Sequence, residues 1–143
     1  MQSPSEKLSQ PLSVGAQKTL AAWHAMIASR DTRALPELLD GNAVFRSPVA
    51  NKPYHGAPVV AVILQAAEQV FSNFAYHREF VSDDGQSVVL EFSADVGDKS
   101  LKGIDMIRFD DLGKIVEFEV MVRPASGVQA LGEAMGARLA GRV

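Results

Sequence analysis

The chain has 143 residues, of which 47% are hydrophobic and 22% are charged, with a net charge of −3 and no cysteine. These values describe one ordinary globular domain with a sizeable core. With 14 basic and 17 acidic residues, no positive excess is present to neutralise the phosphates of a nucleic acid. The lack of cysteine excludes disulfides, thiolate metal sites and a cysteine nucleophile. No signal peptide or membrane-spanning run is recognisable, so we expect a cytoplasmic protein that binds neither nucleic acid nor membrane.

The N-terminal half is predicted to be mainly helical. Residues 1–13 read as a polar arm rich in Ser, Gln and Pro, and a single domain follows over residues 14–143. Apolar residues at helical spacing predict a first helix over Ala16–Ser29. A short second helix carries Leu35, Leu38 and Leu39, and Gly41 and Asn42 are expected to end it.

A short strand and a third helix come next along the chain. The segment AVFRSP, residues 43–48, predicts a strand that Pro48 stops, and VANKPYHG is expected to be a loop. The third helix starts near Ala57 with Pro58 in its first turn, where the missing N–H costs nothing. Its apolar stripe is the clearest helical periodicity in the chain.

After Asn73 the apolar period changes from 3.6 to 2, which predicts strands joined by short hairpins. The predicted strands are Phe74–Ser82, Ser87–Val96, Leu101–Asp110 and Ile115–Val122. A last helix is expected over residues 125–140, with Ser126 as its cap. Helices followed by consecutive antiparallel strands predict an α+β domain, with the helices packed on one face of a curved sheet.

Asp105 does not fit the strand that contains it. Alternation puts it on the same face as Leu101, Ile107 and Phe109. An isolated carboxylate in apolar surroundings is costly, so it must be paired, hydrogen-bonded or protonated. Burial raises a carboxyl pKa, and a neutral Asp can donate a hydrogen bond to a ligand oxygen. The alternative is a structural Asp bonded to a neighbouring Trp, Tyr or backbone N–H.

The string GIDMIRFDDLGKIVEF, residues 103–118, together with this order of elements, resembles the nuclear transport factor two-like superfamily. The resemblance is to its SnoaL-like and ketosteroid isomerase-like branch and covers residues 14–123. It implies a cone-shaped, curved, mixed or antiparallel sheet wrapped around the N-terminal helices, the cystatin-like α+β roll. It also implies an apolar pocket at the open end and a homodimer formed through the outer face of the sheet.

The resemblance assigns roles to a few positions. Ketosteroid isomerases have a similar IDxFRF strand in which a protonated Asp donates to the oxyanion, and Asp105 matches that residue. Where they have a donor Tyr on the first helix, this chain has Trp23, whose indole N–H can still donate. Where they have the general-base Asp before a Pro, it has Ser47, which needs a neighbouring base to move a proton. Related epoxide hydrolases carry an Asp in the last strand, where this chain has Val120.

The remaining candidates concern a possible base and the lining of a pocket. His55 lies before the third helix and is the expected base if the protein is an enzyme. Tyr54 is expected at the pocket rim. The predicted ligand-binding residues are Trp23, Phe45, Ser47, Tyr54, Ile63, Phe92, Ile107, Phe118, Val120 and Val122. No metal and no cofactor is expected, because the histidines are scattered and no nucleotide-binding fingerprint is present.

Three functions stay open on the sequence alone. The first is a pocket that binds a small apolar molecule with a carbonyl or hydroxyl group, anchored by Asp105 and Trp23. The second is a proton-transfer enzyme of the isomerase or cyclase type, with Asp105 as oxyanion donor and His55 as base. The third is a dimeric association module whose pocket is filled by its own side chains; Ile104 and Met106 on the outer face favour it.

Overall fold

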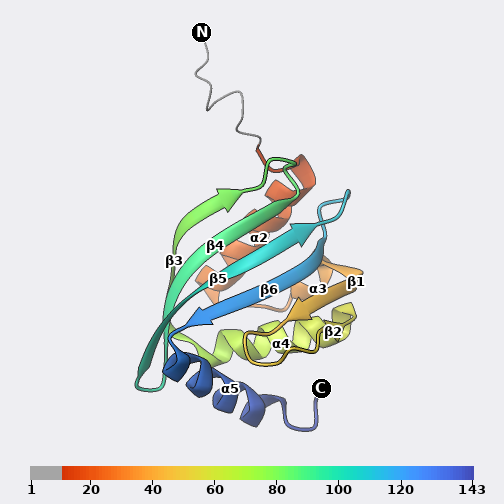
Figure 1. Cartoon of the computed structure of the whole chain (residues 1–143). Coiled ribbons are helices and arrows are strands. Elements are labelled where there is room, and N and C mark those ends of the chain that lie inside the picture. The colour runs from red at the N-terminus through yellow and green to blue at the C-terminus, as the bar shows by residue number, and fades with distance from the viewer. Residues whose placement is uncertain (1–10) are drawn as a thin grey trace.

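The computed structural model describes residues 11–143 and contains four helices and six strands in that range (Figure 1). The helices are α2 (Val14–Ser29), α3 (Leu35–Leu38), α4 (Ala57–Val70) and α5 (Ala125–Leu139). The strands are β1 (Leu39–Arg46), β2 (Tyr54–His55), β3 (Ser72–Val81), β4 (Ser87–Val96), β5 (Lys99–Phe109) and β6 (Ile115–Arg123). Residues 1–10 of the predicted N-terminal arm lie outside the described residues.

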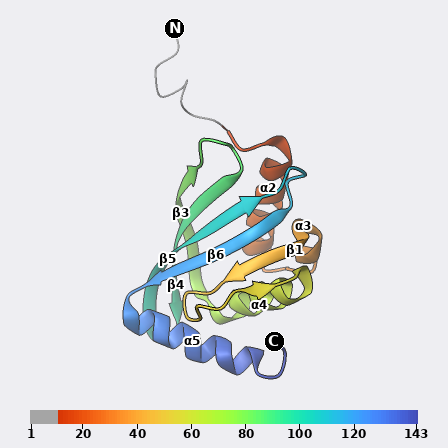
Figure 2. The ribbon, with the colours of Figure 1, turned by 45° about the vertical axis from the view of Figure 1, so that its right-hand side comes forward.

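The strands form one mixed sheet in the order β2-β1-β6-β5-β4-β3. Strand β1 runs parallel to β6, and the other neighbouring pairs are antiparallel. The sheet is strongly curved, with α2 and α4 against its concave side and α5 across one end, next to α4 (Figures 1 and 2). The predicted α+β fold with a curved sheet around N-terminal helices is confirmed.

Helices α2 and α4 form because their apolar residues fall on one side. In α2 the buried positions are Ala16, Thr19, Leu20, Trp23 and Met26, at spacings of three and four. Ser13 accepts a hydrogen bond from the backbone N–H of Ala16 at 3.4 Å and caps this helix. Helix α4 has Pro in its first turn and ends where Phe71 becomes extended. Both helices therefore present their apolar sides to the sheet.

Strand β5 alternates as its sequence predicts. Leu101, Gly103, Asp105, Ile107 and Phe109 are all buried, and the residues between them are exposed or half-buried. The pleat of the strand thus places the Asp105 side chain on the concave side of the sheet, facing the helices.

The region around β1 differs from the prediction. Leu39 begins β1 instead of extending the short helix, and Gly41 and Asn42 belong to the strand. The pairing of β1 with β6 shifts register between Leu39 and Val44, and a bulge of this kind accommodates residues that disfavour regular strands. Asp40 stabilises the irregular segment by accepting from the backbone N–H of Asn42 at 2.8 Å. Gly41 and Asn42 were therefore interpreted as the end of a helix, whereas they lie in a bulge of β1.

Two smaller expectations were also wrong. The segment expected to be a loop contains β2, whose Tyr54 and His55 pair with β1. The cap position of α5 is Pro124 and not Ser126, and no side chain caps the helix.

Near the other end of the chain, Leu12 is buried and the backbone N–H of Ser13 donates to the carbonyl of Gly85 at 3.0 Å. The last residues of the predicted arm thus pack onto the β3–β4 turn.

The convex face of the sheet combines an ion-pair cluster with apolar side chains. Glu91 is only 7% exposed and is bound by Arg78 at 2.5 Å and Lys102 at 3.2 Å, which lowers its pKa to about 2. Phe80 and Met121 are about half exposed on the same side. Homodimer formation through this face stays a prediction.

None of the helices within residues 11–143 combines the length and apolarity needed to cross a membrane.

A substitution at Gly103 tests how closely β5 is packed beside Asp105. A Cβ on Gly103 would lie 2.6 Å from the Phe92 ring and would also meet the carbonyl oxygen of Met121. We therefore expect Gly103→Ala to lower the free energy of unfolding by about 1–3 kcal/mol, measured by urea denaturation. The matched control is Gly41→Ala in β1, whose added Cβ has no neighbour within 4 Å. Equal stabilities of the two variants would contradict this packing.

Candidate functional site

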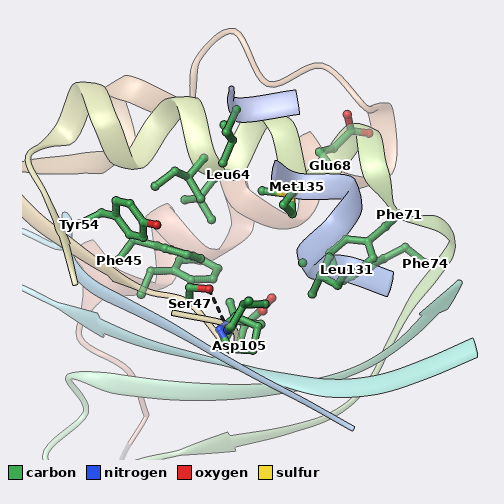
Figure 3. A pocket seen from close by; sticks show the side chains of 18 of the residues that line it. Phe45, Ser47, Tyr54, Leu64, Glu68, Phe71, Phe74, Asp105, Leu131 and Met135 are labelled. Carbon is green, nitrogen blue, oxygen red and sulfur yellow. Dashed lines mark hydrogen bonds between the residues drawn. The ribbon is translucent and has the colours of Figure 1, made fainter. Parts of the chain in front are cut away.

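A cavity of about 650 Å³ lies between the concave face of the sheet and helices α2, α4 and α5 (Figure 3). This volume is within the range of about 300–1,000 Å³ that is usual for small-molecule sites. Most of its wall is apolar, with Phe45, Leu64, Phe71, Phe74, Leu131 and Met135 around it. The polar side chains that reach it are Trp23, Arg30, Ser47, Tyr54, Glu68, Asn73, Tyr76 and Asp105.

Asp105 belongs to a chain of hydrogen bonds that starts on α2. The indole Nε1–H of Trp23 donates to the hydroxyl oxygen of Tyr76 at 2.9 Å. The Tyr76 hydroxyl donates in turn to Oδ2 of Asp105 at 2.5 Å. Three elements, α2, β3 and β5, are thereby joined at the base of the cavity. The structural alternative, an Asp bonded to a neighbouring Tyr, therefore holds, and the same Asp also lines the cavity.

Burial controls the protonation of this group. Asp105 is 6% exposed, and burial raises its pKa from 3.8 to about 7, although the hydrogen bond from Tyr76 opposes the rise. Burial and the nearby Asp105 carboxyl also raise the pKa of Tyr76 well above its usual value, which keeps the phenol neutral. Near neutral pH a large part of the Asp105 population is thus a neutral carboxylic acid, which has a proton to donate.

The residues around Asp105 explain why its side chain has little solvent exposure. Its cross-strand partners are Leu90 on β4 and Val120 on β6. Two residues earlier, Gly103 leaves room for the Phe92 ring. On the helix side, the Trp23 ring packs on Phe118 with centroids 5.2 Å apart. The carboxyl group is therefore enclosed by apolar side chains except where it meets Tyr76 and the cavity.

The structure brings most of the predicted site residues together. Those that line the cavity with Asp105 are Trp23, Phe45, Ser47, Tyr54, Ile63, Phe118 and Val120. Three others do not line it: Phe92 and Ile107 are 0% and 1% exposed within the core, and Val122 packs with the cluster around Leu131. These three share a sheet face with cavity residues, but their side chains are covered by other core residues.

Two predicted polar residues have a different role from the one expected. His55 is exposed on β2 and is not among the cavity residues, so the geometry gives no support to it as a base. Ser47 reaches the cavity, but its Oγ accepts from the backbone N–H groups of Val49 and Ala50 at 2.9 and 3.3 Å. Ser47 is therefore a turn residue as well as a lining residue.

Sequence reasoning missed Tyr76 as the partner of Asp105. Its place on the inner side of the predicted strand was a signal, but β4 lies between their two strands. Only the curvature of the sheet makes the contact possible. Arg30, Glu68 and Asn73 were also missed, because each lies near the end of an element and none belongs to an apolar stripe. Within residues 11–143, no group of three or more His, Asp or Glu side chains is placed to hold a metal ion.

Comparison with known proteins agrees with this geometry. The family model for a SnoaL-like domain matches residues 20–118. The chain belongs to the SnoaL-like domain family. The predicted nuclear transport factor two-like superfamily is thereby confirmed. No curated protein matches this SnoaL-like chain at a significant level.

Solved structures similar to this SnoaL-like protein include one described as an enzyme and others of unknown function. A steroid delta-isomerase from Pseudomonas aeruginosa is 65% identical, with a TM-score of 0.90 and coverage of 93% of this chain and 97% of that one. An uncharacterized protein with a cystatin-like fold from Silicibacter pomeroyi is 35% identical, with a TM-score of 0.81 and coverage of 88% of each chain. An NTF2-like protein of unknown function from Mesorhizobium loti, 20% identical with a TM-score of 0.71 and coverage of 81% and 97%, shares the fold.

The raised pKa of Asp105 predicts how stability depends on pH. Between pH 4 and pH 7 the folded protein keeps a proton on Asp105 that the unfolded chain releases, so stability falls as pH rises. A change in pKa from 3.8 to about 7 corresponds to about 4 kcal/mol in total. We expect the stability of the native protein relative to Asp105→Asn to fall by about this amount between pH 4 and pH 8, measured by urea denaturation.

The control for this prediction is Asp98→Asn, in the exposed turn between β4 and β5. Its stability should follow the native protein at every pH. Parallel pH profiles for the native protein and Asp105→Asn would show that Asp105 titrates alike in the folded and unfolded states, which is incompatible with a desolvated carboxyl.

Proposed function

We propose that this SnoaL-like protein binds a small apolar molecule with a carbonyl or hydroxyl group, and that neutral Asp105 donates a hydrogen bond to the oxygen of that group. The observation that carries the proposal is a buried carboxyl with a pKa of about 7 at the base of an apolar cavity. Apolar walls with few polar groups are typical of small-molecule sites, in which the polar groups fix the orientation of the ligand.

The hydrogen bonds around Tyr76 favour Asp105 as the donor. The Tyr76 hydroxyl has one proton, which it gives to Asp105, and its oxygen already accepts from Trp23. Neither Tyr76 nor Trp23 therefore has a free proton for the ligand. A neutral Asp105 keeps the bond from Tyr76 at Oδ2 and offers its own proton from Oδ1. Once Asp105 ionises, both of its oxygens accept only, and a ligand carbonyl loses its partner.

A pair of probes that differ in one oxygen tests this proposal. We expect 2-acetylnaphthalene to bind more tightly than 2-ethylnaphthalene at pH 5.5, by about tenfold, as one hydrogen bond with favourable geometry would give. The preference should disappear by pH 8.5, because Asp105 then carries no proton. Isothermal titration calorimetry at the two pH values measures both affinities.

Two substitutions separate hydrogen bonding from shape in this test. Asp105→Leu should bind both probes equally at either pH. Asp105→Asn keeps an N–H donor, so its preference for the ketone should persist at pH 8.5. If neither probe binds the native protein, or if the Leu variant keeps the pH-dependent preference, the proposed function is wrong.

A second candidate function is proton transfer in the same cavity, as in an isomerase. It is favoured by the 65% identity to a protein described as a steroid delta-isomerase. Such chemistry needs a base, and besides Asp105 the carboxylate that lines the cavity is Glu68 on α4. Glu68 is bound to Arg30 at 2.6 Å. Among residues 11–143, Ser47 has no partner that would make it a base, and its Oγ accepts from two backbone N–H groups.

An assay with a Δ5-3-ketosteroid distinguishes the two functions. The binding proposal expects a complex in which the absorbance of the conjugated enone does not rise. The isomerase alternative expects turnover that Asp105→Leu and Glu68→Gln each reduce by at least about 10²-fold, the usual range for loss of acid–base catalysis. Turnover that survives Glu68→Gln would exclude Glu68 as the base.

A further inference from the structure

Arg30 lines the cavity from the C-terminal end of α2, in an unusual backbone conformation. Its φ is 60°, and Asn73 at the start of β3 has a φ of 51°. Within residues 11–143 these are the two residues other than glycine with positive φ, and both line the same cavity. Glycine is the usual residue at such a helix end because other side chains are strained there. Strained positions of this kind gather at binding sites.

One edge of the Arg30 guanidinium is already occupied. Its Nε donates to Oε1 of Glu68 at 2.6 Å, and its Nη2 donates to the backbone carbonyl of Glu68 at 3.2 Å. Glu68 therefore fixes the side edge of the guanidinium and holds it at the cavity. The end formed by Nη1 and the second proton of Nη2 has no hydrogen-bond partner among residues 11–143. The Arg30 side chain is 60% exposed, so this end is open to an incoming group.

Arg30 and Glu68 together carry no net charge, so the free end of Arg30 attracts an anion through its unpaired N–H donors. The Glu68 side chain is 12% exposed. The next carboxylate along the chain, Asp31, is paired with Arg33 at 2.7 Å. Asn73, which lines the same cavity, has an uncharged side chain whose amide N–H donates to Asp95 at 2.8 Å. An arginine end held in place by one carboxylate can bind a second one through two parallel N–H···O bonds.

We infer that the ligand of this cavity is bipolar: its carbonyl or hydroxyl end binds Asp105, and a carboxylate at its far end binds the free Nη1–Nη2 end of Arg30. The inference rests on the proposed function, since it names the class of molecule that the same cavity takes. The apolar body of the ligand packs against the apolar wall of the cavity, which includes Phe71, Phe74 and Met135. The cavity is thus a site for an apolar keto or hydroxy acid.

A series of acids of increasing length tests this inference. The probes are ω-(4-acetylphenyl)alkanoic acids with two to eight methylene groups, each matched with the 4-alkylacetophenone of the same length. At pH 6 Asp105 is mostly neutral and the probe acid is ionised. We expect one length at which the acid binds at least about tenfold more tightly than its uncharged match, as a bidentate charged hydrogen bond gives. Isothermal titration calorimetry measures both affinities.

Three variants assign the preference to Arg30. Arg30→Met should remove the preference for the acid, and a far-UV circular dichroism spectrum like that of the native protein shows that the variant is folded. Arg33→Met is the matched control, because Arg33 is three residues away, 91% exposed and absent from the cavity. Glu68→Gln keeps a side-chain oxygen that can accept from Arg30 Nε but removes a competing negative charge, so it should strengthen binding of the acid.

The outcomes separate this inference from the proposed function. Ketones that bind with no preference for the acid at any length overturn the role of Arg30 and leave Asp105 as the anchor. A preference that survives Arg30→Met overturns it as well. If neither series binds, the proposed function fails, and this inference fails with it.

Discussion

The buried carboxyl of Asp105 is the constraint on which the rest of the site depends. A carboxyl group enclosed by Leu90, Val120 and the Trp23–Phe118 pair must be neutral or well hydrogen-bonded. The protein meets this requirement with one strong hydrogen bond from Tyr76 and with a pKa near 7. The same carboxyl group also lines the apolar cavity, so the side chain that is costly to bury is one of the few polar groups that the cavity offers to a ligand.

The network also links parts of the fold that are distant in sequence. Trp23 lies on α2, Tyr76 on the edge strand β3, and Asp105 in the middle of the sheet. Each bond is satisfied only when the sheet is curved enough to bring β3 toward α2. The aromatic side chains around it, including Phe74 and Phe92 with centroids 5.0 Å apart, pack against the inner face and help to hold that curvature. The hydrogen bonds of the site therefore depend on the curvature of the sheet.

The SnoaL-like fold supplies the cavity, and its lining residues determine what the cavity can do. Relatives with this fold include a protein described as a steroid delta-isomerase and others with no known function, so the fold alone does not select an activity. In this chain the buried Asp105 stands at the position where the resemblance leads us to expect an oxyanion donor, whereas the position expected to hold a general base is Ser47, in a turn. The proposed ligand site needs only Asp105 to hold an oxygen, and proton transfer would need Glu68 as its base.

The sequence by itself determined the α+β class, the four long strands and the face on which Asp105 lies, because these depend on local periodicity. It also determined most of the apolar lining, since Phe45, Ile63 and Phe118 lie on predicted inward faces. It did not determine the bulge in β1, where Gly41 and Asn42 were taken for a helix end, or the placement of His55 away from the cavity. The tertiary structure alone decided the Tyr76–Asp105 bond and the grouping of Arg30 with Glu68, because those contacts join residues 29 and 38 positions apart. The first reaches across the curved sheet, and the second forms where the end of α2 packs beside α4.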